Sequence, residues 1–218
     1  MGDIIGMVVG RVISISASEV REMDVATDTM PYARWHEYSK YLAAASGEHY
    51  KLLATIASKF VDGRFVDVGT FLGHSALALS VGHEALGNRV FSYDNKDSKD
   101  SNHNTESIKS HAGIELRVRD EIGSDDVVRE IASIAADLIL LDVSPHDGKF
   151  ERDFVAGLVR HGYKGLLLLD DIHLNPEMTA FWQWIPAERK LDLTEIGHWS
   201  GTGLVAFDPE HTIDVVVE

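Results

Sequence analysis

Three short apolar runs, each followed by a glycine or an acidic residue, predict the buried strands of a sheet. Residues 65–68 (FVDV) precede Gly69 and a helical pattern that begins near Gly73, so this stretch predicts a strand, a sharp turn and a helix. Residues 137–142 (DLILLD) and 165–170 (GLLLLD) are almost continuously apolar, as expected of strands buried on both faces. A strand, a glycine turn and a helix in this order are typical of the first unit of a doubly wound sheet.

The chain continues this alternation up to a final pair of strands. Residues 190–196 and 203–207 flank a polar HWSGT segment and predict an antiparallel hairpin at the sheet edge. The fold class is therefore predicted as α/β, a Rossmann-like doubly wound, mostly parallel seven-stranded sheet with a C-terminal antiparallel hairpin. The other predicted elements are strands at 89–94 and 114–118 and helices at 102–112, 125–135, 149–161 and 176–185.

The first 60 residues carry a different pattern. Residues 1–16 are apolar and predict an extended arm or strand, which would suit packing on a partner subunit in a homodimer. Residues 19–31 are polar and predict a loop, and residues 32–60 predict two helices broken near Ser46 and Gly47. We expect one domain over residues 1–218, with the arm and a helical lid at 1–60 and the Rossmann-like core at 61–208.

One face of the first predicted helix carries Trp35, Tyr38 and Leu42, which fall at helical spacing. Ordinary core packing explains this face, and a lid that covers a cofactor or an acceptor explains it as well. The sequence leaves both interpretations open.

Composition and charge exclude several classes of function. The 218 residues carry a net charge of −15, which disfavours a nucleic-acid partner because affinity for phosphates comes mainly from basic side chains. No cysteine is present, so disulfides, thiolate metal sites and a cysteine nucleophile are excluded, and a cytoplasmic location is expected. The apolar start is interrupted by Asp3 and Arg11 and is too short for a membrane span, so no membrane partner is expected.

Acidic residues close two neighbouring apolar runs. Asp142 ends one run, and Asp170 and Asp171 end the next. If these strands are neighbours, three carboxylates converge, and their mutual repulsion favours a bound cation. Ligation by oxygen alone selects Mg²⁺ first, with Mn²⁺ or Ca²⁺ as alternatives. Consecutive strand residues face opposite sides, so both Asp170 and Asp171 can ligate only if the chain leaves strand geometry there; otherwise one of them caps the next helix.

A possible nucleoside site lies nearer the start of the sheet. Asp94 ends the second predicted strand, about 20 residues after the glycine turn, where nucleoside-binding α/β folds hold ribose hydroxyls. A carboxylate can accept two hydrogen bonds from a vicinal diol. A turn residue at the strand end is the alternative interpretation. The turn itself is not the G-x-G-x-x-G of dinucleotide binders.

The stretch D-V-G-T-F-L-G at residues 67–73 resembles the first motif, D/E-x-G-x-x-x-G, of class I S-adenosylmethionine-dependent methyltransferases. With the order of the predicted strands, the resemblance covers residues from about 50 to 208. It implies S-adenosylmethionine as the cofactor, and it implies an acidic contact to the adenine amino group at Asp120, which in this sequence could equally be a solvated loop residue. The cofactor-binding residues that it implies are Asp67, Gly69, Ser75, Asp94 and Asp120.

The segments LLDVSPHDG and LLLLDDIH resemble the corresponding strand ends of metal-dependent O-methyltransferases of the catechol and macrolide-sugar types. The resemblance implies that Asp142, Asp170 and Asp171 hold Mg²⁺ or Mn²⁺. It also implies that His146 is the general base, since the sugar-modifying relatives carry a His in this loop where the catechol enzymes carry a Lys. The competing candidates for the base are His173, His198 and Lys149.

The resemblance to the sugar-modifying relatives in this loop implies a sugar hydroxyl, rather than a phenol, as the acceptor. The final segments offer Trp182, Trp184 and Trp199, whose faces could stack on a ring, although the first two are equally explained as core residues. The HWSGTG segment resembles enzymes that O-methylate mannosides in mycobacterial methylmannose polysaccharide. A phenolic or natural-product acceptor, a nicotinamide-dependent oxidoreductase and a non-catalytic binding or dimerisation module remain as alternatives.

Overall fold

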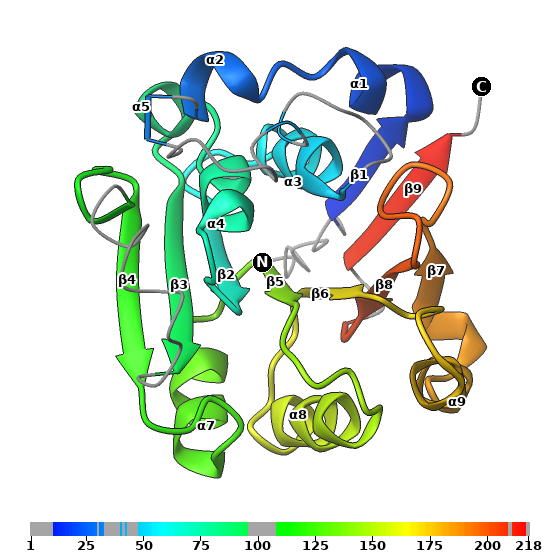
Figure 1. The fold of residues 1–218 in the computed structure, drawn as a ribbon. Helices are drawn as coiled ribbons and strands as arrows, with labels where there is room; N and C mark the ends of the chain where they lie inside the picture. The colour runs from blue at the N-terminus through cyan, green and yellow to red at the C-terminus, as the bar shows by residue number, and fades with distance from the viewer. Residues whose placement is uncertain are drawn as a thin grey trace, which may run out of the picture.

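The computed structural model places a twisted sheet between two groups of helices (Figure 1). Helices α3 (Tyr50–Ala57) and α4 (His74–Leu79) cover one face, and α7 (Asp125–Ser133) and α8 (Lys149–Arg160) cover the other. The structure describes residues 11–29, 31–32, 40, 42, 48–95, 108–208 and 211–216.

The sheet confirms the predicted fold class. Its first five strands in space run parallel, and β8 and β7 add an antiparallel pair at one edge. Further helices along the chain are α5 (His83–Leu86), α9 (Pro176–Trp184) and the 3₁₀-helix Ala187–Arg189. In spatial order the strands are β4 (Ile114–Arg119), β3 (Arg89–Asn95), β2 (Arg64–Val68), β5 (Leu138–Leu141), β6 (Leu166–Asp170), β8 (Thr202–Ala206) and β7 (Lys190–Asp192).

The strand order reverses between β2 and β5. Strand β2 pairs with β3 on one side and with β5 on the other, and β6 lies next to β5. In open α/β sheets, ligands bind beyond the carboxyl ends of the strands at such a reversal. The glycine turn after β2 and the acidic ends of β5 and β6 all lie at this edge.

Two hydrophobic cores hold the sheet from its two faces. Along β5, Leu138 and Leu140 pack in the core beneath α3 and α4, while Ile139 and Leu141 pack in the core beneath α7 and α8. This alternation follows from the two-residue period of a strand. Because both faces are buried, the strand is apolar throughout, which is why the sequence shows an unbroken apolar run.

Two short helices replace the loop predicted at residues 19–31. Helix α1 (Ala17–Glu22) begins with a capping box, in which the Ser16 hydroxyl accepts from the Glu19 amide at 3.1 Å and the Glu19 carboxylate accepts from the Ser16 amide at 2.9 Å. Helix α2 (Ala26–Thr29) follows. The prediction was wrong because the segment is mostly polar, yet two of its apolar side chains, Val20 and Val25, are buried.

The described part of the predicted N-terminal arm is a strand that pairs with another strand of the same chain. Strand β1 (Arg11–Ser16) pairs in parallel with β9 (His211–Val216), with Ile13 opposite Ile213. The predicted strand is thus confirmed for residues 11–16, and it pairs with β9 within the chain; packing on a partner subunit stays a prediction. Strand β9 has no counterpart in the sequence-based prediction.

Two further predictions meet the structure only in part. Strand β7 ends at Asp192, not at residue 196, because the Asp192 carboxylate accepts from the Thr194 amide at 3.0 Å and turns the chain. Most of the helices predicted at 32–46 and 102–112 lies outside the described residues, as do Trp35 and Tyr38. Leu42 is buried, which agrees both with core packing and with a lid over a ligand.

Candidate active site

The turn after β2 can be made only by glycine. Gly69 has φ +107°, and a Cβ there would lie 1.8 Å from the backbone oxygen of Asp142. Gly73 has φ +78° and precedes α4, where a Cβ would lie 2.1 Å from the Ile108 side chain. Both positions therefore need the left-handed backbone and the missing side chain that glycine provides. The consequence is that β2 and β5 approach each other closely at their carboxyl ends.

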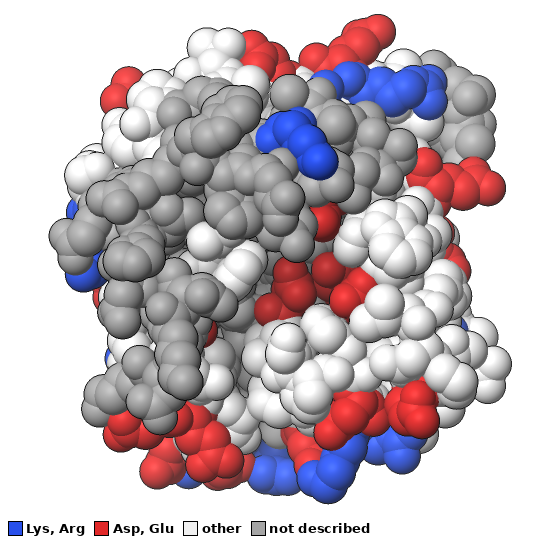
Figure 2. Space-filling view, viewed as in Figure 1, with Lys and Arg blue, Asp and Glu red and all other residues white. Residues whose placement is uncertain are grey.

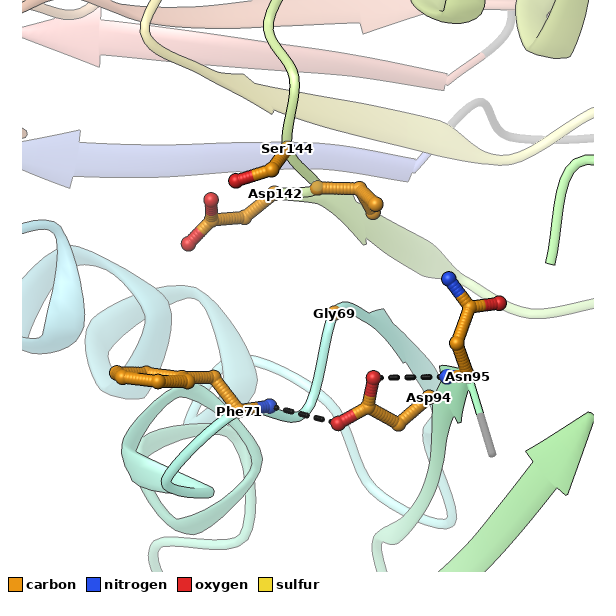
Figure 3. A pocket seen from close by; sticks show the side chains of 7 residues that line it. Gly69, Phe71, Asp94, Asn95, Asp142 and Ser144 are labelled. Carbon is orange, nitrogen blue, oxygen red and sulfur yellow. Dashed lines mark hydrogen bonds between the residues drawn. The ribbon is translucent and has the colours of Figure 1, made fainter. Parts of the chain in front are cut away.

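A cavity of about 500 Å³ opens at this turn. In Figure 3, Gly69, Phe71 and Asp94 lie on one side of the space, and Asp142 and Ser144 lie across from them. The lining residues are Gly69, Phe71, Asp94, Asn95, Asp142, Val143 and Ser144. Of these, the sequence had predicted Gly69, Asp94 and Asp142 as site residues.

Asp94 is fixed at the cavity wall by backbone amides. Its carboxylate accepts from the Phe71 amide at 3.1 Å and from the Asn95 amide at 2.8 Å (Figure 3). Burial raises the pKa of Asp94, and the two amide hydrogen bonds lower it. Each carboxylate oxygen accepts one of these bonds and keeps further lone-pair capacity, so Asp94 can still accept from a diol in the cavity.

Asp67 and Ser75 do not line this cavity. Asp67 is fully buried in β2, where it accepts from the Ser92 hydroxyl at 2.6 Å. Burial raises the pKa of Asp67 to about 6, against the Ser92 and Ser75 hydroxyls, which lower it. Its second oxygen, Oδ1, has no hydrogen-bond partner in the described part of the chain. Asp67 therefore links β2 to the neighbouring strand β3 through Ser92.

Asp120 is not among the residues that line the cavity. It is exposed and follows β4, whereas the cavity wall beside Asp94 is completed by Asn95, whose side-chain oxygen accepts from the Ile122 amide at 3.0 Å. The prediction for Asp120 therefore rests on the resemblance alone. Sequence reasoning missed Asn95 and Phe71, since neither belongs to the glycine or acidic pattern that directed attention to this edge.

The carboxylates after β5 and β6 face one region. Strand β6 lies next to β5; Asp142 directly follows β5, and Asp170 is the last residue of β6. Asp171 has φ +60°, which takes it out of strand geometry and allows it to face the same side as Asp170. Asp170 contacts His198 Nδ1 at 3.0 Å, and the Ser200 hydroxyl donates to Asp171, so both carboxylates bind the β7–β8 loop.

Two residues that the sequence did not single out join this region. Glu48 and His49 directly precede α3, and His49 Nδ1 lies 3.3 Å from Asp170 Oδ1. His49 is 1% exposed. Its burial lowers its pKa, but the carboxylates of Asp170, Asp142 and Glu48 outweigh this and raise the pKa to about 9. No local motif marks His49, because only the tertiary fold brings it to β6.

The electrostatic environments of Asp142 and Asp170 are opposite. Burial and the charges of Asp170 and Asp171 raise the pKa of Asp142 well above its usual range, and His49 offsets this only in part. Burial also raises the pKa of Asp170, but His49 and His198 lower it further than burial raises it. Asp142 is thus a half-buried carboxylate without enough positive charge around it, and its binding of a divalent cation together with Asp170 and Asp171 stays a prediction.

His146 lies beside Asp171. It has φ +54°, and its Nε2 atom is 3.5 Å from Asp171 Oδ2. Its carbonyl oxygen accepts from the Asn175 side chain at 2.9 Å, which fixes the loop. The competing candidates are exposed and have other carboxylate partners. His173 contacts Asp192 at 2.7 Å, and Lys149 contacts Asp153 at 2.6 Å.

The three tryptophans have different environments. Trp182 is buried and packs against Gly203, where an added Cβ would lie 2.7 Å from the Trp182 ring. Trp182 is therefore a core residue. Trp184 is 47% exposed and lies under the Arg152 guanidinium at 5.3 Å. Trp199 is 72% exposed and packs edge-on against His198, with ring centroids 5.6 Å apart. Trp199 is therefore the tryptophan presented beside the carboxylates.

The face viewed in Figure 2 is hollowed near its centre, and acidic side chains lie within the hollow. Uncharged side chains border it on the right side of the view.

Among the described residues, no helix is long and apolar enough to span a membrane.

Comparison with known proteins identifies the fold. No family model matches the sequence, and no curated protein matches it. Solved structures match the fold at low sequence identity. The SAH-bound methyltransferase PaMTH1 of Podospora anserina is similar over 73% of this chain and 77% of its own, with 16% identity and a TM-score of 0.56.

Two other structures extend this similarity. A candidate caffeoyl-CoA O-methyltransferase from Staphylococcus aureus matches 72% of this chain and 82% of its own, with 10% identity and a TM-score of 0.55. A cofactor-bound protein from MTB matches 90% of both chains, with 14% identity and a TM-score of 0.53. The chain therefore has the Rossmann-like methyltransferase fold.

Proposed function

We propose that this chain is an S-adenosylmethionine-dependent O-methyltransferase that acts on a hydroxyl of a sugar or saccharide. One observation carries the proposal: Asp142 lines the cavity at the glycine turn and also belongs to the carboxylate group formed with Asp170 and Asp171. A methyl donor in the cavity and an acceptor hydroxyl at the carboxylates would therefore meet at Asp142. The fold, which is shared with SAH-bound and cofactor-bound structures, supports the same assignment.

The cavity suits a nucleoside cofactor. Its volume of about 500 Å³ lies within the range of small-molecule sites. The Asp94 carboxylate is positioned to accept from ribose hydroxyls, and Gly69 admits the ligand close to the backbone. Asp67 and Ser75 would hold the turn in place rather than contact the cofactor.

The chain's own residues would hold the acceptor and receive its proton. Asp142, Asp170 and Asp171 would hold Mg²⁺ or Mn²⁺, which when bound would orient the acceptor oxygen and favour its deprotonated form. His146 would accept the hydroxyl proton at its imidazole, next to Asp171 at 3.5 Å. The exposed ring of Trp199 would stack against the acceptor, because an aromatic face suits the C–H face of a sugar ring.

Transfer of labelled methyl from S-adenosylmethionine tests the proposal. The acceptors are simple sugars, methylated mannosides and catechols, each assayed with Mg²⁺ and with a chelator. We expect label on a saccharide, lost with the chelator. Label on catechols alone would replace the saccharide acceptor with a phenolic one. Binding of the cofactor product without transfer to any acceptor would favour a non-catalytic binding module.

A further inference from the structure

Four side chains with metal-binding atoms converge at the acceptor side of the site. Glu48, His49, Asp170 and His198 each offer one ligand atom, and these atoms all lie within 4.8 Å of one another. They come from three distant parts of the chain: the segment before α3, the end of β6 and the β7–β8 loop. Three of the four are buried. Of the three carboxylates Asp142, Asp170 and Asp171, only Asp170 also belongs to this group.

The spacing of these atoms suits a small cation with nitrogen ligands. Bonds of about 2.0–2.2 Å in a tetrahedral site place neighbouring ligand atoms about 3.3–3.6 Å apart. Asp170 Oδ1 lies 3.3 Å from His49 Nδ1 and 3.0 Å from His198 Nδ1. These two separations need to change by only a few tenths of an ångström around an ion, whereas the atoms of the group that lie up to 4.8 Å apart would have to move about 1.2 Å closer.

His49 provides an independent indication of a ligand. It is 1% exposed, and neither of its ring nitrogens has a hydrogen-bond partner among the described residues. A buried polar group without a partner is costly, so such a group calls for an explanation. The contact with Asp170 has an ion-pair distance but not the geometry of a hydrogen bond. A ring nitrogen aimed at a carboxylate across such a gap is the arrangement that a bound ion between them would complete.

The geometry points to a second kind of metal site in this chain, a Zn²⁺-type transition-metal site held by Glu48, His49, Asp170 and His198. Two imidazoles with two carboxylates favour zinc and similar ions, whereas Mg²⁺ prefers oxygen ligands alone. The inference deepens the proposed function, on which it rests only through the shared residue Asp170. An ion here would tie the segment before α3 and the loop that carries Trp199 to the end of β6.

Metal binding by the whole chain tests the inference without any methyl donor. The chain is stripped with a chelator, dialysed and titrated with Co²⁺ or Zn²⁺, with Co²⁺ followed by its visible absorption. We expect one equivalent of Co²⁺, displaced by Zn²⁺, with the absorption of nitrogen and oxygen ligands in a low-coordinate site. His49→Gln and His198→Gln should each weaken binding by more than about 100-fold, because even residues that only support a ligand account for 10–100-fold.

The control is His161→Gln, since His161 contacts Asp125 far from the group, and this variant should bind Co²⁺ as the unchanged chain does. Glu48→Gln provides a second variant that preserves side-chain volume, should His49→Gln fail to fold, and its binding should weaken as well.

Three results would overturn the inference: no binding of Co²⁺ or Zn²⁺, binding that His49→Gln and His198→Gln leave intact, or displacement of the bound Co²⁺ by Mg²⁺ as readily as by Zn²⁺. In the first case His49 and His198 are internal ion-pair partners of Asp170. Each of these results leaves methyl transfer to be decided by its own labelling assay, so failure of the metal site and failure of the proposed function remain distinguishable.

Discussion

Replacing Gly69 with alanine tests whether the close approach of β2 and β5 shapes the cofactor cavity. The added Cβ would lie 1.8 Å from the Asp142 backbone oxygen, against an ordinary contact of at least 3.4 Å. The two strand ends must therefore separate by about 1.6 Å, or the turn must rearrange. Both changes displace Asp142, which lines the cavity and ends β5.

The size of the effect follows from two contributions. Backbone strain at φ +107° costs about 1–3 kcal/mol in a residue with a Cβ, and the steric conflict adds about 1–3 kcal/mol. A loss of about 2–6 kcal/mol lowers the melting temperature of a chain of this size by something on the order of 10 °C. Methyl transfer should fall by about 100-fold or more, because a shift of about 1 Å at a reacting centre has that effect.

The assay compares thermal unfolding and calorimetric binding of S-adenosylhomocysteine. Gly162→Ala is the matched control, because Gly162 also has a positive φ, +73°, but a Cβ there would meet nothing within 4 Å. It should cost about 1 kcal/mol from backbone strain alone and leave cofactor binding unchanged. If Gly69→Ala binds the cofactor as the unchanged chain does and unfolds no earlier than Gly162→Ala, the assignment of the glycine turn to the cofactor is refuted.

Three further predictions address the rest of the site. The pKa of Asp67 is raised from 3.8 to about 6, so the folded state holds this proton more tightly and the free energy of unfolding falls as pH rises from about 4 to 6. In denaturant unfolding, Asp67→Asn should remove up to about 3 kcal/mol of that fall. An unchanged pH profile in this variant would contradict the prediction. His146→Ala should lower methyl transfer by about 10²–10⁴-fold with unchanged cofactor affinity, while His173→Ala stays near the original rate; equal losses in both would exclude His146 as the base. Trp199→Ala should raise the KM for a saccharide with less than about 0.5 kcal/mol change in stability, because its ring is 72% exposed, and an unaltered KM would remove it from the acceptor site.

Local patterns were enough to predict the sheet. The apolar runs of β2, β5 and β6 are visible in the sequence because strands buried on both faces leave no polar positions. The order of elements then fixed their parallel arrangement, since helical crossovers join parallel strands. From that arrangement, the meeting of Gly69, Asp94 and Asp142 at one edge could be predicted without coordinates.

Other features depended on contacts between distant segments. The polar composition of residues 19–31 concealed α1, whose stability comes from its cap and from a single buried valine. Strand β1 needed β9, which begins at residue 211, so no local pattern could identify its partner. Whether Asp170 and Asp171 could act together depended on one dihedral angle, φ +60° at Asp171, which residue type does not determine.

The sequence by itself determined the fold class, the glycine turn and the strand-end carboxylates, because each depends on the order and polarity of neighbouring residues. The tertiary structure alone decided which histidines meet those carboxylates. His49 and His198 flank Asp170 only because α3 and the β7–β8 loop pack at the end of β6. Charges in a buried site are set by whatever the fold brings within a few ångströms, and those neighbours are not neighbours in the chain.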